Sequence, residues 1–347
     1  MSTSALTRRD FIERASILSA IGALAANGAA AATRDLTAAA RPQFSAGFRT
    51  IDIRTAEATI HGAIGGSGPP VLLLHGWPQT HLIWRAVAPR LARDFTVVVT
   101  DLRGYGDSSV PPDGENHEGY SKRAMARDQV EVMRSLGFER FAVIGHDRGG
   151  RVGHRMALDH PECVSKLAVI DIVPTLKLYT SVTKSFATAY WHWFFLIQPA
   201  PLPEDLLLKS AESFLRGRFK RSRKPGVSSA SLIPDAISEE TFAEYLRCFQ
   251  DPRRMHAMCE DYRAGATIDL EHDRADLERK VGCPVLVLWG ADNPGVDALF
   301  DVRATWRERA TDVRGRSLPG GHYLPEQLPE AVHAECLRFI RPVDPGR

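Results

Sequence analysis

The feature that most constrains this chain is the run Gly-His-Asp-Arg-Gly-Gly-Arg at positions 145–151, which directly follows the apolar stretch 141–144. It has the G-x-Nu-x-G form of a nucleophile elbow, a sharp strand-to-helix turn that exposes one reactive side chain above a sheet. The central residue is Asp147, where a serine would indicate attack on esters or amides. A carboxylate there predicts attack on an alkyl carbon, with a covalent ester as intermediate.

Asp147 has a second interpretation as a simple helix N-cap, because aspartate is favoured at that position. A cap does not require the flanking glycines, Gly145, Gly149 and Gly150, which permit close backbone approach. The glycines therefore favour the nucleophile over the cap.

Short apolar runs alternate with helical patterns along the chain, which is typical of a parallel sheet with right-handed crossovers. After Pro174 the pattern becomes mainly helical and stays so to about Arg274. This order predicts an α/β-hydrolase fold, a mostly parallel sheet flanked by helices, with a helical cap above the carboxyl ends of the strands. The expected elements are a hairpin at 48–64, strands at 71–74, 96–100, 141–144, 167–170 and 285–289, and helices at 122–136 and 148–158.

The chain divides accordingly into a signal segment (1–40), a first part of the core (41–173), the cap (174–274) and a second part of the core (275–347). In the first segment, Thr7-Arg8-Arg9-Asp10-Phe11-Ile12 resembles the twin-arginine export pattern. An apolar stretch at 15–26 and small residues for cleavage at 29–32 follow it. We expect a periplasmic or secreted protein, and a cytoplasmic one if this segment is not a working signal.

Charge and cysteine content exclude several classes of partner. A formal net charge of +2 is too small to indicate nucleic acid or an acidic membrane surface. We expect no membrane association once the signal is removed. The five cysteines are scattered without metal-ligand spacing, so we interpret them as small buried apolar residues.

A general base is expected at His322, in the glycine-rich loop Gly-Gly-His-Tyr after the last predicted strand. The order nucleophile, acid, histidine is the one that this fold uses. A carboxylate must also fix the tautomer of the imidazole. Asp171 and Asp292 both follow predicted strands, and spacing alone leaves the choice between them open.

Arg148 and Arg151 lie three residues apart, so they share one face of the first helical turn. The helix dipole disfavours positive charge at that end, and a bound carboxylate would explain both side chains. A structural salt bridge is the alternative. The arginines therefore predict a small anionic molecule as substrate. The backbone N–H groups of Arg148 and of Trp77, in the loop His-Gly-Trp-Pro, are the expected oxyanion hole.

The cap contains the aromatic run Tyr-Trp-His-Trp-Phe-Phe at 190–195. Such a run is most often core packing. Indole, imidazole and phenol groups in a dry cavity would also suit a departing halide as weak donors, and both interpretations fit the sequence.

These motifs resemble the fluoroacetate (haloacetate) dehalogenases of the α/β-hydrolase superfamily over most of the chain, from about Phe48 to Ile340. The resemblance rests on the elbow, the loop at 75–78, the segment Asp-Leu-Arg-Gly-Tyr-Gly-Asp-Ser at 101–108, and the cap run His-Trp-Phe-Phe-Leu-Ile-Gln-Pro at 192–199. It implies no cofactor and no metal, and homodimers are common among the proteins it resembles. The implied roles are Asp147 as nucleophile, His322 as base, Asp171 as acid, Arg148 and Arg151 as carboxylate ligands, and His192, Trp193 and Tyr262 as halide ligands.

Two other functions fit parts of the pattern. An epoxide hydrolase would use the same aspartate and histidine, with cap tyrosines to protonate the opening oxygen (Tyr179, Tyr190, Tyr245 or Tyr262). A neutral epoxide, however, has no negative charge for Arg148 and Arg151 to bind. A non-catalytic ligand receptor of the same fold would not need the water-activating base.

Overall fold

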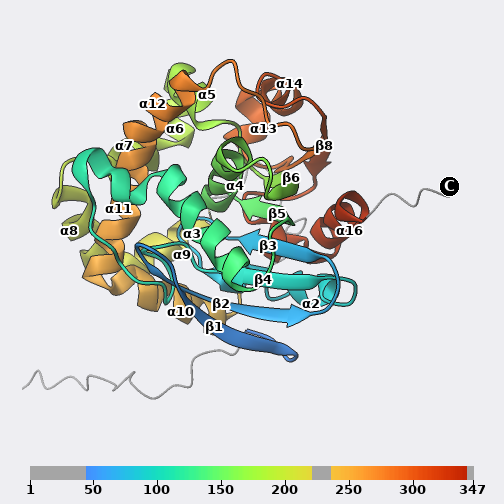
Figure 1. Cartoon of the computed structure of the whole chain (residues 1–347). Helices are drawn as coiled ribbons and strands as arrows, with labels where there is room; N and C mark the ends of the chain where they lie inside the picture. Colours follow the sequence, from blue (N-terminus) through green and yellow to red (C-terminus); the bar gives the residue numbers. More distant parts are fainter. Residues whose placement is uncertain (1–43, 221–235, 342–347) are drawn as a thin grey trace, which may run out of the picture. The chain divides into compact units, whose positions relative to one another are not determined.

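The computed structural model describes residues 44–220 and 236–341 of the chain (Figure 1). The predicted export segment at 1–40 lies outside these residues. Within the described ranges, no helix is both long and apolar enough to cross a membrane.

An eight-stranded sheet forms the centre of the fold, in the order β1-β2-β4-β3-β5-β6-β7-β8. The hairpin pair β1/β2 and the pair β2/β4 are antiparallel, and the remaining neighbours are parallel. This arrangement confirms the predicted α/β-hydrolase fold. The strands are β1 (Phe48–Arg54), β2 (Thr59–Gly66), β3 (Pro70–Leu74), β4 (Thr96–Thr100), β5 (Phe141–His146), β6 (Val164–Ile170), β7 (Val285–Gly290) and β8 (Val313–Leu318).

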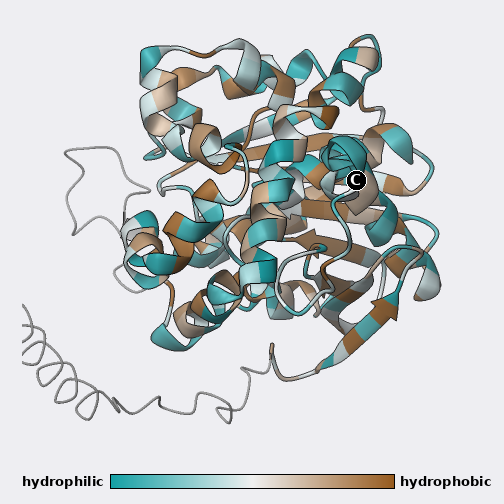
Figure 2. Ribbon diagram, turned by 90° about the vertical axis from the view of Figure 1, so that its left-hand side faces the viewer, coloured by the Kyte–Doolittle hydropathy of each residue, from teal (hydrophilic) through white to brown (hydrophobic). Residues whose placement is uncertain are grey.

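The inner strands form because their sequences are continuously apolar, as expected of strands covered on both faces. Every residue of β5 is buried, and in β3 all but the first are buried. Figure 2 shows this concentration of hydrophobic residues along the sheet. Apolar side chains from the two faces form two separate core clusters.

Helices cover both faces of the sheet (Figure 1). Helix α3 begins where the Ser121 side chain accepts a hydrogen bond from the backbone N–H of Ala124, an N-cap that satisfies one free donor. The core elements are η2 (His81–Trp84), α2 (Ala88–Leu91), η3 (Glu115–Tyr120), α3 (Lys122–Ser135), α4 (Arg148–Asp159), α13 (Val296–Leu299), α14 (Val302–Arg307), α15 (Leu324–Gln327) and α16 (Pro329–Ile340).

A second group of helices lies between β6 and β7 in the sequence. Helix α11 is the longest of these, and its side chains reach from the helical segment to the elbow. The helices are α5 (Thr175–Thr180), α6 (Lys184–Ala189), α7 (Trp191–Leu196), α8 (Leu202–Lys209), α9 (Ala211–Lys220), α10 (Glu239–Gln250), α11 (Pro252–Ala266) and α12 (Ile268–Ala275).

Candidate active site

Asp147 lies at the turn between β5 and α4 with φ of 45° and ψ of −116°, a conformation that L-residues rarely adopt. Such strain costs about 1–3 kcal/mol and is characteristic of functional sites. The turn can form only because its neighbours are glycines. A Cβ at Gly149 would lie 2.4 Å from the carbonyl oxygen of His75, and one at Gly145 would lie 2.5 Å from that of Gly149. The elbow predicted from the sequence is therefore present.

His322 and Asp171 are hydrogen-bonded, with 2.5 Å between Nδ1 and Oδ2. The other ring nitrogen, Nε2, lies 3.9 Å from Oδ2 of Asp147. Asp171 has a φ of 58° and also accepts from the backbone N–H of Gly290 at 2.9 Å and from the side chain of Asn293. Asp292, the other candidate, makes no side-chain hydrogen bond or ion pair with His322 in the described structure.

The surroundings of Asp147 favour its charged form. Burial opposes ionisation, but nearby positive groups, led by His322 and Arg151, outweigh it and lower the pKa of Asp147. Burial and the adjacent His322 lower the pKa of His146 to about 3, so that ring is neutral at physiological pH. The elbow thus presents an ionised carboxylate in a buried place, which is the state that a nucleophile requires.

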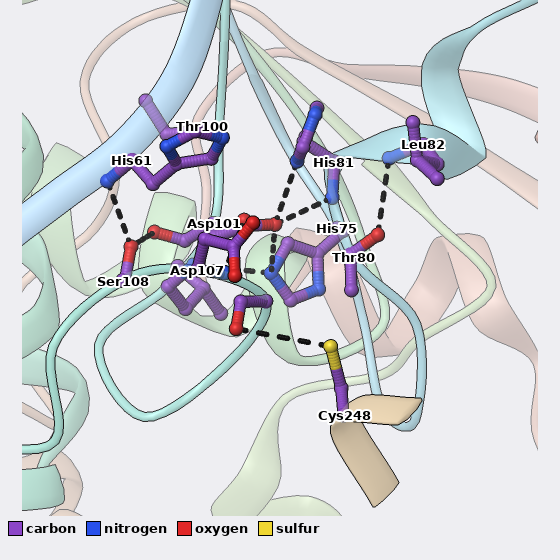
Figure 3. Close-up of polar contacts among 12 residues, drawn as sticks. His61, His75, Thr80, His81, Leu82, Thr100, Asp101, Asp107, Ser108 and Cys248 are labelled. Carbon is purple, nitrogen blue, oxygen red and sulfur yellow. Dashed lines mark hydrogen bonds and ion pairs between the residues drawn. The ribbon is translucent and has the colours of Figure 1, made fainter. Parts of the chain in front are cut away.

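The backbone N–H of Trp77, one of the two expected oxyanion donors, points at the elbow and donates to Oδ1 of Asp147 at 3.2 Å. Asp101, directly after β4, binds residues of the loop after β3 (Figure 3). Its Oδ1 accepts from the backbone N–H of His81 at 2.8 Å and lies 2.9 Å from Nδ1 of the same residue. Nε2 of His75 accepts from the backbone N–H of Leu102 at 3.0 Å. These contacts join the residues on either side of Trp77 to the loop after β4.

Arg151 faces the same cavity as Asp147. Its Nη1 donates to the carbonyl oxygen of Val173 at 2.9 Å and to the hydroxyl of Thr175 at 3.0 Å. Its Nε is buried and has no hydrogen-bond partner among the described residues. The guanidinium stacks over the Trp193 ring at 4.7 Å. A buried cation with a donor to spare is suited to an anionic ligand.

Arg148 is placed differently. Its Nε and Nη2 donate to the carboxylate of Asp261 at 2.9 and 2.6 Å, and the guanidinium lies 4.3 Å above the Tyr262 ring. The salt-bridge alternative for this residue is therefore realised in the structure. Only Nη1 is left without a partner in the described part of the chain. Arg148 and Arg151 are a pair in the sequence, but they differ in which N–H group lacks a hydrogen-bond partner among the described residues.

The aromatic residues predicted for the halide gather around the cavity. His192 and Trp193 come from α7, and Tyr262 comes from α11. The Tyr262 ring centroid lies 5.6 Å from that of Trp193 and 6.2 Å from that of His192. Burial raises the pKa of Tyr262 far above its usual value, so its hydroxyl remains protonated. All three side chains line one cavity of about 950 Å³ together with Asp147 and His322.

Arg218, in α9, is a cavity residue that the sequence analysis missed. Its Nη2 lies 3.1 Å from Nε2 of His192, and its guanidinium lies 5.6 Å from the Trp77 ring. Burial and Arg218 hold the pKa of His192 well below its usual value. Because arginine has only donors, Nε2 of His192 must accept, and the ring hydrogen is therefore on Nδ1. The sequence carries no signal for this contact, since α9 is rich in charged residues and looks like a solvated helix.

Comparisons with known proteins agree with this geometry. The family described as alpha/beta hydrolase fold matches residues 69–326. A fluoroacetate dehalogenase of Burkholderia sp is 47% identical over 85% of this chain and 94% of its own. A soluble epoxide hydrolase of Corynebacterium sp. (strain C12) is 36% identical over 82% of this chain and 94% of its own. A solved structure from Nostoc sp PCC 7120, described as an alpha/beta hydrolase, matches with a TM-score of 0.82 and 52% identity, covering 87% of this chain and 100% of that chain.

Fold and site together define an enzyme of the hydrolase class, built on the α/β-hydrolase fold. Within that class, the chain belongs to the fluoroacetate dehalogenase family.

Proposed function

We propose that this enzyme hydrolyses the carbon–halogen bond of short 2-haloacids, with a covalent ester on Asp147 as intermediate. The observation that carries the proposal is a single cavity in which Asp147 meets a buried arginine, Arg151, and the ring groups of His192 and Trp193. A nucleophile, an anion receptor and weak donors for a halide are the three parts that such a reaction needs. The identity to a fluoroacetate dehalogenase supports this substrate class.

In the first step, a carboxylate oxygen of Asp147 attacks the carbon that carries the halogen. A carbon–oxygen ester bond forms as the carbon–halogen bond breaks, and the halide leaves with the bonding pair. Arg151 holds the substrate carboxylate, assisted by Nη1 of Arg148, so that the carbon is in line for attack. The halide departs toward His192, Trp193 and Tyr262, whose N–H and O–H groups stabilise its charge.

In the second step, His322 takes a proton from water, and the hydroxide attacks the carbonyl carbon of the Asp147 ester. Asp171 orients the imidazole and stabilises the imidazolium. The backbone N–H groups of Trp77 and Arg148 stabilise the tetrahedral oxyanion. The intermediate collapses to a 2-hydroxyacid and free Asp147, and the imidazolium returns its proton to solvent. No metal or organic cofactor takes part.

Epoxide hydrolysis is the second candidate. The observation that favours it is that Tyr190 and Tyr262 both line the cavity, where a phenol could protonate an opening epoxide. The identity to a soluble epoxide hydrolase supports it as well. A neutral epoxide offers no negative charge to the Nε donor of Arg151, which is unpaired among the described residues, and we therefore favour the haloacid.

Halide release from a small substrate panel tests the choice. We expect release from fluoroacetate, chloroacetate or 2-chloropropionate, and little or no opening of styrene oxide, which lacks a carboxylate. Substitution of Arg151 by leucine removes a charged hydrogen-bond donor worth about 1.5–3 kcal/mol. Haloacid turnover should therefore fall roughly 10- to 150-fold, with a much smaller loss on any epoxide that is turned over. Equal losses of turnover on haloacid and epoxide would contradict a role of Arg151 in binding the substrate carboxylate.

The mechanism is tested separately by trapping. His322→Ala leaves the nucleophile intact but removes the base, so chloroacetate should convert the enzyme to a stable covalent adduct. Intact-mass spectrometry should show one added group, and peptide mapping should place it on Asp147. A variant that stays unmodified with every 2-haloacid of the panel would refute the ester intermediate.

A further inference from the structure

A second group of titratable side chains lies outside the cavity, where the loop after β4 meets two helices of the segment between β6 and β7. Asp113 lies in the loop, His117 in η3, Glu204 in α8, and His256 and Glu260 in α11. Helix α11 packs against both α8 and η3, and the side chains of these elements contact one another there. The proposed reaction uses none of them.

His256 is held between two carboxylates. Its Nδ1 lies 3.0 Å from Oε1 of Glu204, and its Nε2 lies 3.0 Å from Oδ2 of Asp113. Two ligands about 2.1 Å from one metal ion are about 3.0 Å apart at an octahedral angle and about 3.4 Å apart at a tetrahedral angle. A histidine that binds a metal with one nitrogen usually donates from the other to a carboxylate. Asp113 is thus at ligand distance, and Glu204 has the position of the supporting carboxylate.

Glu260 lies one helical turn after His256, so both side chains project from the same face of α11. One ligand atom each from Asp113, His256 and Glu260 lie within 4.8 Å of one another. His117 borders the group, with 2.6 Å between its Nδ1 and Oε2 of Glu260. One imidazole and two carboxylates therefore converge, and a second imidazole contacts one of these carboxylates.

The charges of the group match a divalent cation. Arg263 neutralises one of three carboxylates, because its Nη1 lies 2.8 Å from both Oε1 of Glu204 and Oε1 of Glu260. A histidine that binds a metal is neutral, and with both histidines neutral a net charge of about two negative units is left. Glu204 is 5% exposed, and its Oε2 is buried without a hydrogen-bond partner among the described residues. An unpaired buried carboxylate oxygen is costly unless a further positive charge is nearby.

We propose that Asp113, His117, His256 and Glu260 bind one divalent transition-metal ion, with Glu204 orienting the His256 ring. Mixed imidazole and carboxylate ligands suit zinc, cobalt or nickel better than magnesium or calcium. The site opens to solvent, since the side chains of His117, His256 and Asp113 are 34%, 36% and 44% exposed. The ion would fasten α8 and α11 to the loop after β4. The site is independent of the proposed reaction.

Metal titration of the untagged full chain, after treatment with a chelator, tests the site. Isothermal titration with Zn²⁺ should give one site per chain, and Co²⁺ should give visible d–d bands. His256→Asn should abolish both signals. Glu204→Gln should weaken Zn²⁺ binding about 10- to 100-fold, the usual effect of losing a supporting carboxylate. His117→Asn should also weaken Zn²⁺ binding. Because His117 is partly exposed, this variant keeps the buried contacts of α11.

Two matched histidines serve as controls. His160 pairs with Glu162 at 3.8 Å, and His61 belongs to a separate group with His81 and Asp101. His160→Asn and His61→Asn should bind Zn²⁺ like the wild type. The assignment is wrong if the wild type shows neither one-site heat nor Co²⁺ bands. It is also wrong if His256→Asn and His117→Asn bind normally, or if only His61→Asn loses binding. A His256 ring doubly protonated at pH 8 in a protein that takes up no metal would likewise overturn it.

Discussion

Among single residues, substrate binding depends on which N–H donors of Arg148 and Arg151 are not already used in contacts within the protein. Arg148 uses Nε and Nη2 on Asp261, and Arg151 uses Nη1 on the carbonyl of Val173 and on Thr175. The helix dipole that makes both arginines unfavourable is therefore offset by different means. The buried carboxylate of Asp261 compensates the charge of Arg148. Arg151 has Asp147 beside it, and its Nε is unpaired among the described residues. Arg151 is the stronger candidate for substrate binding.

Arg218 should set the tautomer of His192, and with it the direction of one donor in the cavity. We expect ¹⁵N NMR of selectively labelled protein to show the His192 hydrogen on Nδ1 in the wild type. Arg218→Leu removes the donor to Nε2 and should allow the Nε2–H tautomer to appear. The same variant should lower kcat for chloroacetate roughly tenfold, the effect of one misdirected hydrogen bond of about 1 kcal/mol or slightly more. A wild-type ring protonated on Nε2 would contradict this assignment.

At the scale of elements, α11 connects the elbow to the helical segment through Asp261. This carboxylate binds Arg148, the ammonium group of Lys122 and the hydroxyl of Tyr105 at 2.6 Å. Asp261→Asn leaves the buried Arg148 cation without its counter-charge, so we expect a loss of about 3–5 kcal/mol in the free energy of unfolding. Urea denaturation measures it. Asp205→Asn, on the exposed part of α8, is the matched control and should change stability by less than about 0.5 kcal/mol. Equal stability of the two variants would rule out this role for α11.

Local signals made the β5–elbow–α4 unit predictable: an apolar run, a reactive residue and glycines within eleven positions. The choice between Asp171 and Asp292 was not local, because their strands, β6 and β7, are neighbours in the sheet. The loop after β7 brings Asn293, and not Asp292, to the Asp171 carboxylate. Arg218 and Asp261 were missed as site residues for a related reason. Their partners lie 26 and 113 positions away, and pattern reasoning does not pair charges across such separations.

For the whole molecule, the N-terminal sequence bears on where the protein works. The pair Arg8-Arg9 and the residues after it have the order of a twin-arginine signal. We propose that the protein is exported, and that replacing both arginines by lysine keeps it inside the cell. Fractionation of the native host, with immunodetection of the wild type and the lysine variant, measures this. Equal amounts of both proteins in the cytoplasmic fraction would exclude export by this route.

Glu326 joins three distant parts of the chain. It lies in α15 and accepts from the Tyr245 hydroxyl of α10 at 2.9 Å and from Gln79, after β3, at 2.5 Å. Burial raises the pKa of Glu326 to about 8. The unfolded chain releases this proton near pH 4.5, so between about pH 4.5 and 8 the folded state holds the extra proton. This contribution to stability is therefore present at low pH and is lost as the pH rises.

Glu326→Gln keeps the shape of the side chain but has no proton to lose. The difference in unfolding free energy, wild type minus variant, should fall with rising pH across that window, with a slope of up to about 1.4 kcal/mol per pH unit. Urea denaturation at several pH values from 5 to about 8 measures the slope, and the other titrating groups cancel in the difference. A flat difference would mean that Glu326 is ionised in the folded protein, and that its contacts with Tyr245 and Gln79 compensate a buried charge.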